Sequence, residues 1–326
     1  MSLYKVFFLC VASFLLLTDL NAQSLQAISD IQKARVELGR YLFYNADLSI
    51  NGTMSCATCH EQKRGFADGN TMHPGALGDP AKRNVPGLAN VGSFKNLTWA
   101  NNQLNNLAQH ALIPIRGTEP VEMGMNGYED EIAKRLEPSS CYQELFRSAF
   151  PKREGAINLD TITLALETFQ KTLISNNSLY DQTQKKKISL PTQEARSGEK
   201  LFFTKAKCAS CHPAPLFSDD SFHYVAQKDS INVNSVEDNG LFDVTNDSKD
   251  KNFFRTPSLR NVTLSAPYWH NGSAKTLQEA IVKHSVILDN DLTAQEIEDL
   301  IAFLETLTDN SFVRNAHFSK PSKRCQ

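Results

Sequence analysis

Two short segments with the same pattern of cysteine and histidine lie in opposite halves of the chain. Residues 56–60 read Cys-Ala-Thr-Cys-His and residues 208–212 read Cys-Ala-Ser-Cys-His. In a C-x-x-C-H segment the two thiols can form thioethers to the vinyl groups of one porphyrin, and the adjoining histidine binds the iron. One copy is also compatible with a zinc or redox site, but two copies predict two covalently bound haem c groups. The predicted haem-binding residues are Cys56, Cys59, His60, Cys208, Cys211 and His212, with His60 and His212 as iron ligands.

The composition is that of a globular protein with room for two domains. The chain has 326 residues, of which 41% are hydrophobic and 21% charged, and a net charge of −2. That length accommodates two domains of ordinary size, so one haem in each is the simplest arrangement. The balanced charge gives no reason to expect nucleic acid or an anionic membrane as a partner.

The N-terminus has the features of a secretory signal. Lys5 precedes an apolar run over residues 6–17, and Ala22 supplies a small residue before Gln23. We therefore expect residues 1–22 to be a signal peptide that is removed. The run is too short to span a bilayer as a permanent helix, and no other stretch is long and apolar enough. The expected location is the bacterial periplasm, which fits haem c because its thioethers form outside the cytoplasm.

Two cysteines remain after the haem motifs and Cys10 of the predicted signal are set aside. They are Cys141 and Cys325. An oxidising compartment would allow them to pair, but sequence does not show that they are close, so both a disulfide and two free thiols stay open.

Hydrophobic periodicity predicts helices throughout the chain and no strand-rich region. Gly39 to Phe43 and Gly198 to Phe202 share the pattern G-x-x-L-F ahead of each haem motif, which indicates a diverged repeat. The polar stretch over residues 176–191 is the predicted boundary. We expect an all-α protein of two cytochrome-c-like haem domains, at residues 23–182 and 183–326, with long irregular loops. The predicted helices are 29–43, 104–112, 129–136, 142–150, 157–173, 192–202, 276–286 and 293–307.

The sixth ligand of each iron separates an electron carrier from an enzyme, since an open position admits peroxide. Beyond Met1, the methionines are at positions 54, 72, 123 and 125, so the second half has none. His284 is the best candidate there because it shares the apolar face of the helix over 276–286. A core histidine without a metal is the alternative.

Candidates near the first haem are more numerous. They are His73, Met72, His110, Met123 and Met125. Glu122 is a lone carboxylate in a weakly charged segment over residues 120–124. If it faces an open haem it can move a proton between the oxygens of peroxide, whereas an ordinary surface glutamate is the alternative.

Several further segments resemble the bacterial di-haem cytochrome c peroxidase and MauG family over nearly the whole mature chain. The matching segments are residues 37–40, 83–86, Trp99, 120–124, 254–262 and 266–268. The resemblance implies a peroxide site at the first haem, Glu122 as its acid/base residue and Trp99 as an electron relay between the haems. It also implies one Ca²⁺ held by the Asn84 side chain and the backbone carbonyls of Arg255 and Pro257.

Three positions depart from the family pattern. His284 aligns with a methionine of the peroxidases and a tyrosine of MauG-like members, so the second haem resembles a His/His variant with a lowered potential. The removable histidine of the peroxidases aligns near Ala76, three residues from His73, which implies a first haem that is permanently open. A distal glutamine of the family aligns with His110, although Gln109 would fit after a one-residue shift.

The expected function is reduction of hydrogen peroxide to water in the periplasm. Electrons would come from a small redox protein, either a cytochrome c or a cupredoxin. Two alternatives remain: a MauG-like oxidase that modifies a partner protein, and a di-haem electron carrier without enzymatic activity. Sequence does not decide between a monomer and a homodimer.

Overall fold

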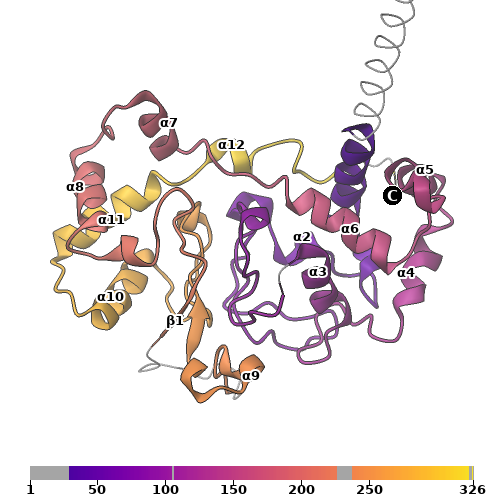
Figure 1. Cartoon of the computed structure of the whole chain (residues 1–326), viewed down its shortest axis with the longest axis horizontal. Helices are drawn as coiled ribbons and strands as arrows, with labels where there is room; N and C mark the ends of the chain where they lie inside the picture. The colour runs from indigo at the N-terminus through magenta and orange to yellow at the C-terminus, as the bar shows by residue number, and fades with distance from the viewer. Residues whose placement is uncertain (1–28, 105, 226–236, 323–324, 326) are drawn as a thin grey trace, which may run out of the picture.

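The computed structural model describes residues 29–104, 106–225, 237–322 and 325 as two helical lobes joined side by side (Figure 1). The predicted signal peptide over residues 1–22 lies outside these ranges. Within them, the one sheet has two short antiparallel strands, β1 (Phe222–Tyr224) and β2 (Phe253–Arg255), with His223 opposite Phe254. The predicted all-α class is therefore confirmed. In the part of the chain that the structure describes, every helix is too short or too polar to cross a bilayer.

The N-terminal lobe begins with a helix over residues 29–43, which has no label in the figures. Its other helices are α2 (Cys56–Cys59), α3 (Leu107–Arg116), α4 (Glu129–Leu136), α5 (Ser140–Ala149) and α6 (Leu159–Gln170). Short 3-10 turns lie between them at Ala46–Leu48, Gln62–Arg64, Val91–Ser93 and Pro151–Arg153. The long segment over residues 60–104 has 3-10 turns and isolated β-bridges but no longer helix or strand, because its glycines, prolines and asparagines favour loops.

The helices of the C-terminal lobe follow. They are α7 (Leu179–Lys186), α8 (Gln193–Phe203), α9 (Phe242–Thr245), α10 (Leu277–Leu288) and α11 (Ala294–Glu305), with 3-10 turns at Cys208–Ser210, Ser248–Asp250 and Val262–Leu264. The short helix α12 (Asn310–Val313) lies in the C-terminal tail. A capping box begins α11, since Thr293 and Glu296 each accept a hydrogen bond from the other's backbone N–H. The stretch predicted as a polar boundary contains α7, which is started by a Ser178/Asp181 capping box.

The two G-x-x-L-F segments pack in the same way. A Cβ on Gly39 would lie 2.0 Å from the carbonyl oxygen of Ala165 in α6, and a Cβ on Gly198 would lie 1.9 Å from that of Asp299 in α11. Each glycine thus lets two helices approach closely. The phenylalanines that end the segments also match: Phe43 and Phe169 have ring centres 5.3 Å apart, and Phe202 and Phe303 have ring centres 5.1 Å apart. The predicted repeat is a real structural repeat.

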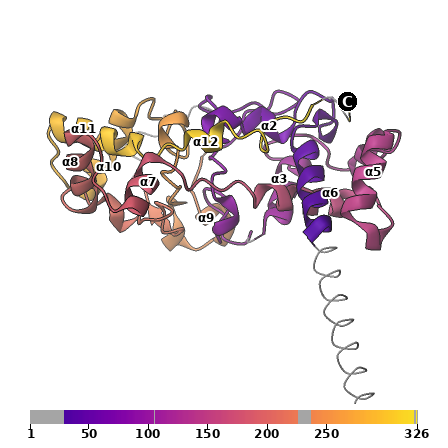
Figure 2. The same cartoon turned by 90° about the horizontal axis from the view of Figure 1, so that it is seen from above.

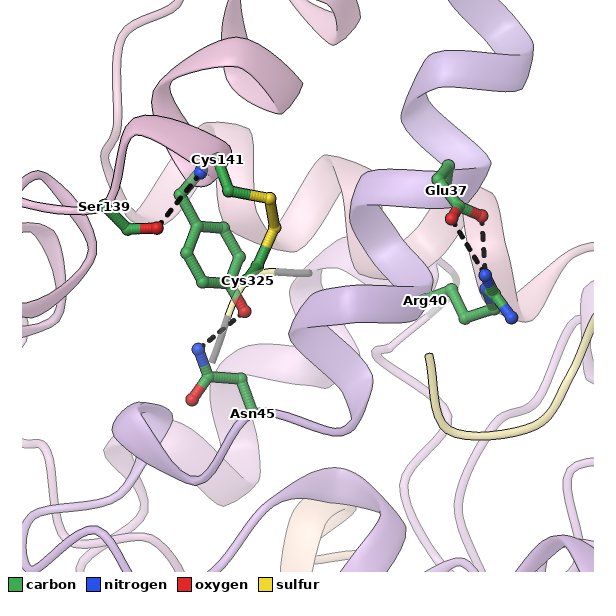
Figure 3. The surroundings of a disulfide bond; sticks show 7 residues. Glu37, Arg40, Asn45, Ser139, Cys141 and Cys325 are labelled. Carbon is green, nitrogen blue, oxygen red and sulfur yellow. Dashed lines mark hydrogen bonds and ion pairs between the residues drawn. A yellow bond between two sulfur atoms is a disulfide. The ribbon is translucent and has the colours of Figure 1, made fainter. Parts of the chain in front are cut away.

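The C-terminal tail returns from the second lobe to the first (Figures 1 and 2). It passes through α12, and Phe312, Phe318 and Cys325 belong to the hydrophobic core of the N-terminal lobe. Cys325 forms a disulfide with Cys141 of α5, with the two Cα atoms 5.3 Å apart (Figure 3). The question that sequence left open is answered in favour of pairing.

Candidate active site

Each C-x-x-C-H segment forms a single helical turn. The first is α2, and the second is the 3-10 turn at Cys208–Ser210. In both, the backbone N–H of the histidine donates to the carbonyl of the first cysteine at 2.9 Å, from His60 to Cys56 and from His212 to Cys208. Residues three apart on a helical turn share one side, so both cysteines of a motif face the same space.

The two motif histidines are oriented by backbone carbonyls. Nδ1 of His60 lies 2.7 Å from the carbonyl oxygen of Phe66, and Nδ1 of His212 lies 3.0 Å from that of Phe217. When Nδ1–H donates to this oxygen, Nε2 is left free as a metal ligand. Phe66 and Phe217 are fully buried and have φ values of 64° and 52°, a region that bulky residues rarely adopt. Sequence reasoning missed both, although a phenylalanine follows each motif histidine by five or six residues.

Burial changes the protonation of the motif side chains. Burial lowers the pKa of His60, and burial with the neighbouring His284 lowers the pKa of His212 to about 4, so both imidazoles are neutral as metal ligation requires. Burial raises the pKa of Cys56 and of Cys59 to about 12, with the Glu122 carboxylate adding to the effect at Cys59.

One continuous cavity of about 690 Å³ joins the two motifs. Its wall includes the cysteines and histidines of both motifs, together with Trp99, His110, Glu122 and His284. A mainly apolar pocket with a few convergent polar groups is the usual form of a cofactor site. The donor set and the cavity therefore fit two haem groups.

His284 is placed where a second imidazole ligand is expected. It lies on α10, whose Leu277 and Ile281 pack against the core of the C-terminal lobe, and its Nδ1 is 2.8 Å from the carbonyl oxygen of Ala280. The ring lines the cavity, and burial among protein atoms lowers the pKa of His284. Ring centres of His212 and His284 are 6.4 Å apart. Two imidazoles on opposite sides of one metal, each with a metal–nitrogen bond of about 2 Å, have ring centres roughly 6 Å apart.

Glu122 and His110 lie on the side of the cavity near the first motif. Burial raises the pKa of the Glu122 carboxyl, against a smaller opposing effect of His73. Burial, with smaller contributions from His60 and Arg255, lowers the pKa of His110 to about 4. Gln109, its neighbour on α3, is exposed to solvent and does not line the cavity. The structure thus places His110, and not Gln109, beside the first motif.

The backbone around Glu122 is held by α3 and by the loop over residues 73–76. The N–H of Met123 donates to the carbonyl of Pro114 at 2.8 Å, and the carbonyl of Glu122 accepts from the N–H of Ala76 at 2.6 Å. Gly75 allows this contact, since a Cβ there would lie 1.9 Å from the carbonyl oxygen of Val121. His73, in the same loop, also lines the cavity, and its Nδ1 is 2.8 Å from the carbonyl oxygen of Pro74.

Trp99 lies where the two lobes meet. Its indole N–H donates to the carbonyl of Asn84 at 2.7 Å, and its own carbonyl accepts from the N–H of Arg255 in β2 at 2.7 Å. The ring is part of the cavity wall between the two motifs. This position suits the relay role that the family resemblance implies.

The residues predicted to hold calcium share one region of the cavity wall, at Asn84, Arg255 and Pro257. The buried Asn84 side chain donates through Nδ2 to the carbonyls of Asn70 at 2.9 Å and Thr71 at 3.3 Å. Its Oδ1 is thereby left as an acceptor, and amide and backbone oxygens are the ligands that Ca²⁺ prefers. Calcium binding stays a prediction.

Comparison with known proteins points to one family. Residues 33–189 match a family model described as di-haem cytochrome c peroxidase. MauG of Methylorubrum extorquens is 34% identical over 84% of this chain and 78% of its own length. Cytochrome c551 peroxidase of Nitrosomonas europaea is 30% identical over 88% of this chain and 83% of its own. A solved MauG-like protein associated with microbial copper homeostasis superposes with a TM-score of 0.82 and 36% identity, covering 88% of this chain and 93% of that one.

Proposed function

Because the chain belongs to the di-haem cytochrome c peroxidase and MauG family of oxidoreductases, we propose that it reduces hydrogen peroxide to water in the bacterial periplasm. The peroxide site is the one bounded by His60, Glu122 and His110. The observation that carries this proposal is a buried carboxyl of raised pKa in the same cavity as a C-x-x-C-H histidine.

The residues of the first site have different roles, which follow from their protonation states. A bound haem supplies the iron that takes the oxidising equivalents of peroxide, with His60 as its protein ligand. Glu122 accepts the proton from one peroxide oxygen and returns it to the oxygen that leaves, which is general acid/base catalysis. His110 stays neutral above a pH of about 4, so its imidazole orients peroxide by a hydrogen bond without adding charge.

The second site takes the role of electron transfer. His212 and His284 would together hold the iron of a second haem, which would suit it to electron transfer, and Trp99 lies between that site and the first at the lobe boundary. The electron donor is a small soluble cytochrome c or cupredoxin. We further propose that the haem domains are residues 23–182 and 183–326 after removal of residues 1–22, and that Asn84 contributes to one Ca²⁺ between them.

A MauG-like oxidase that modifies a partner protein is the second candidate, because a relative at 34% identity is named MauG. Both enzymes need one accessible iron and one closed iron. The electron paramagnetic resonance spectrum of the oxidised protein separates them from a simple carrier: one high-spin and one low-spin haem supports either enzyme, and two low-spin haems support the carrier. Turnover of peroxide with a reduced small cytochrome then favours the peroxidase.

The direct test is Glu122→Gln, which keeps the shape of the side chain and removes its proton chemistry. We expect peroxide turnover to fall by roughly 100-fold to 10,000-fold, the range of general acid/base catalysis, with two haems still bound per chain by mass spectrometry. Glu137→Gln makes the same chemical change on an exposed residue and serves as the control. Unchanged turnover in Glu122→Gln would remove this residue from the mechanism.

A further inference from the structure

Trp269 lies face to face with the imidazole of His284. The two ring centres are 4.6 Å apart and the ring planes make an angle of 29°. This is an offset stacking geometry, in which aromatic rings attract one another beyond the burial of their area. His284 is thus restrained twice, at Nδ1 by the carbonyl of Ala280 and at its face by the indole.

The backbone conformation at Trp269 is strained. Its φ is 73°, in a region that a bulky residue rarely adopts unless the surrounding structure holds it there. The turn that follows is closed by a hydrogen bond from the N–H of Gly272 to the carbonyl of Trp269 at 3.1 Å. A Cβ on Gly272 would lie 2.7 Å from the carbonyl oxygen of Thr71, so the turn also packs tightly against the N-terminal lobe.

The next residue anchors the same turn to the lobe boundary. The carbonyl of His270 accepts from the N–H of Asn84 at 2.7 Å, and the His270 ring stacks on Phe254 with ring centres 3.6 Å apart. Asn84 is also the residue whose carbonyl accepts the indole N–H of Trp99. The position of Trp269 is therefore set by contacts that reach both lobes.

The indole ring of Trp269 is part of the cavity wall. Its Nε1 is buried among protein atoms and has no hydrogen-bond partner in the described structure. The indole therefore acts on the site through its ring face, which stacks on His284.

We propose that Trp269 is a positioning residue that fixes the plane of the His284 imidazole at the second haem. This inference rests on the proposed ligation of that haem by His284. The orientation of an axial imidazole determines how its orbitals overlap with those of the iron, and therefore the low-spin spectrum and the potential of the haem. Without the indole face, the ring plane is restrained at Nδ1 by the carbonyl of Ala280 but no longer at its face, so the imidazole turns more freely about its bond to the iron.

The experiment uses the purified di-haem protein and its single variants Trp269→Phe, Trp269→Leu and Trp269→Met. Trp269→Leu and Trp269→Met remove the ring, whereas Trp269→Phe keeps a stacking face. We expect the two ringless variants to show shifted and broadened low-spin g values. We also expect cyanide to displace the sixth ligand faster by roughly 2-fold to 10-fold, the range that such a stacked pair contributes. Trp269→Phe should stay close to the parent protein.

Two further variants distinguish an error in the assigned iron ligand from an error in the role of Trp269. Tyr128→Leu removes an exposed aromatic ring that is distant from the cavity wall and should change neither signal. His284→Ala should convert the second haem to high spin, and a retained low-spin signal would overturn the ligation itself. If His284→Ala behaves as expected but both ringless variants keep the parent spectrum and displacement rate, the positioning role of Trp269 is wrong.

Discussion

Glu122 differs from other glutamates of the chain in its surroundings and not in its chemistry. Glu131 is paired with Lys134 on the surface of α4, and that lysine lowers its pKa. Glu122 has no such partner in the described hydrogen bonds, and burial raises its pKa instead. A carboxyl is most useful for moving protons when its pKa approaches the working pH, so the cavity around it is part of the catalytic chemistry.

The raised pKa predicts how peroxide turnover depends on pH. Glu122 must be ionised to accept the first proton, so kcat/KM for peroxide should fall as the pH drops through a pKa above the ordinary 4.5. His110 contributes nothing to this limb because its pKa is about 4. A pH profile of kcat/KM measures the limb, and the residual activity of Glu122→Gln should lack it. An identical limb in that variant would assign the titration to another group.

Sequence can identify a residue when its residue type and spacing indicate its chemical role. The two C-x-x-C-H motifs, and His284 on an apolar helix face, belong to this class. Phe66 and Trp269 do not, because the first acts through its backbone carbonyl and the second through a contact created only by the fold. A turn residue with positive φ carries no periodic signal, so sequence reasoning had no means to single it out.

At the scale of elements, hydrophobic period and capping residues predict the long helices well. The segment predicted over residues 293–307 corresponds to α11, which begins with a Thr293/Glu296 capping box. In contrast, the sequence of α7 is mostly polar, and its buried residues are Tyr180 and Thr183. Hydrophobic periodicity therefore does not reveal this helix. β1 and β2 are three residues long each, too short for an alternating pattern to stand out.

The glycine of each repeat should be intolerant of even a methyl group. Gly39→Ala and Gly198→Ala place a Cβ within about 2 Å of a facing helix carbonyl, so the helices must separate. We expect each change to lower the free energy of unfolding by roughly 1–3 kcal/mol or more, as overpacking does. Lys200→Ala on the exposed side of α8 is the matched control and should be nearly neutral. Thermal unfolding of the haem-loaded protein measures the difference, and equal stability would contradict the close approach.

At the scale of the whole molecule, hydrogen bonds and an ion pair outside the predicted haem sites join distant parts of the chain. Asp309, which is buried, accepts from the N–H groups of Asn176 and Asn177 at 3.1 and 2.9 Å. Arg83 forms a two-point ion pair with Asp238, at 2.8 and 2.6 Å, between a loop of the N-terminal lobe and the segment that precedes α9 in the C-terminal lobe. These contacts join residues more than 130 positions apart, and no local pattern predicts them.

The Cys141–Cys325 disulfide joins two parts of the chain covalently, so they stay linked even if the backbone between them is cut. Lys185, Lys186 and Lys187 are exposed at the end of α7, so limited trypsin treatment should cut there. The fragment before the cut carries Cys141 and the fragment after it carries Cys325. The nicked protein should therefore migrate as one band on a denaturing gel and as two bands after reduction, whereas nicked Cys325→Ser should give two bands in both lanes. Separation of the wild-type fragments without reductant would show that the crosslink does not form.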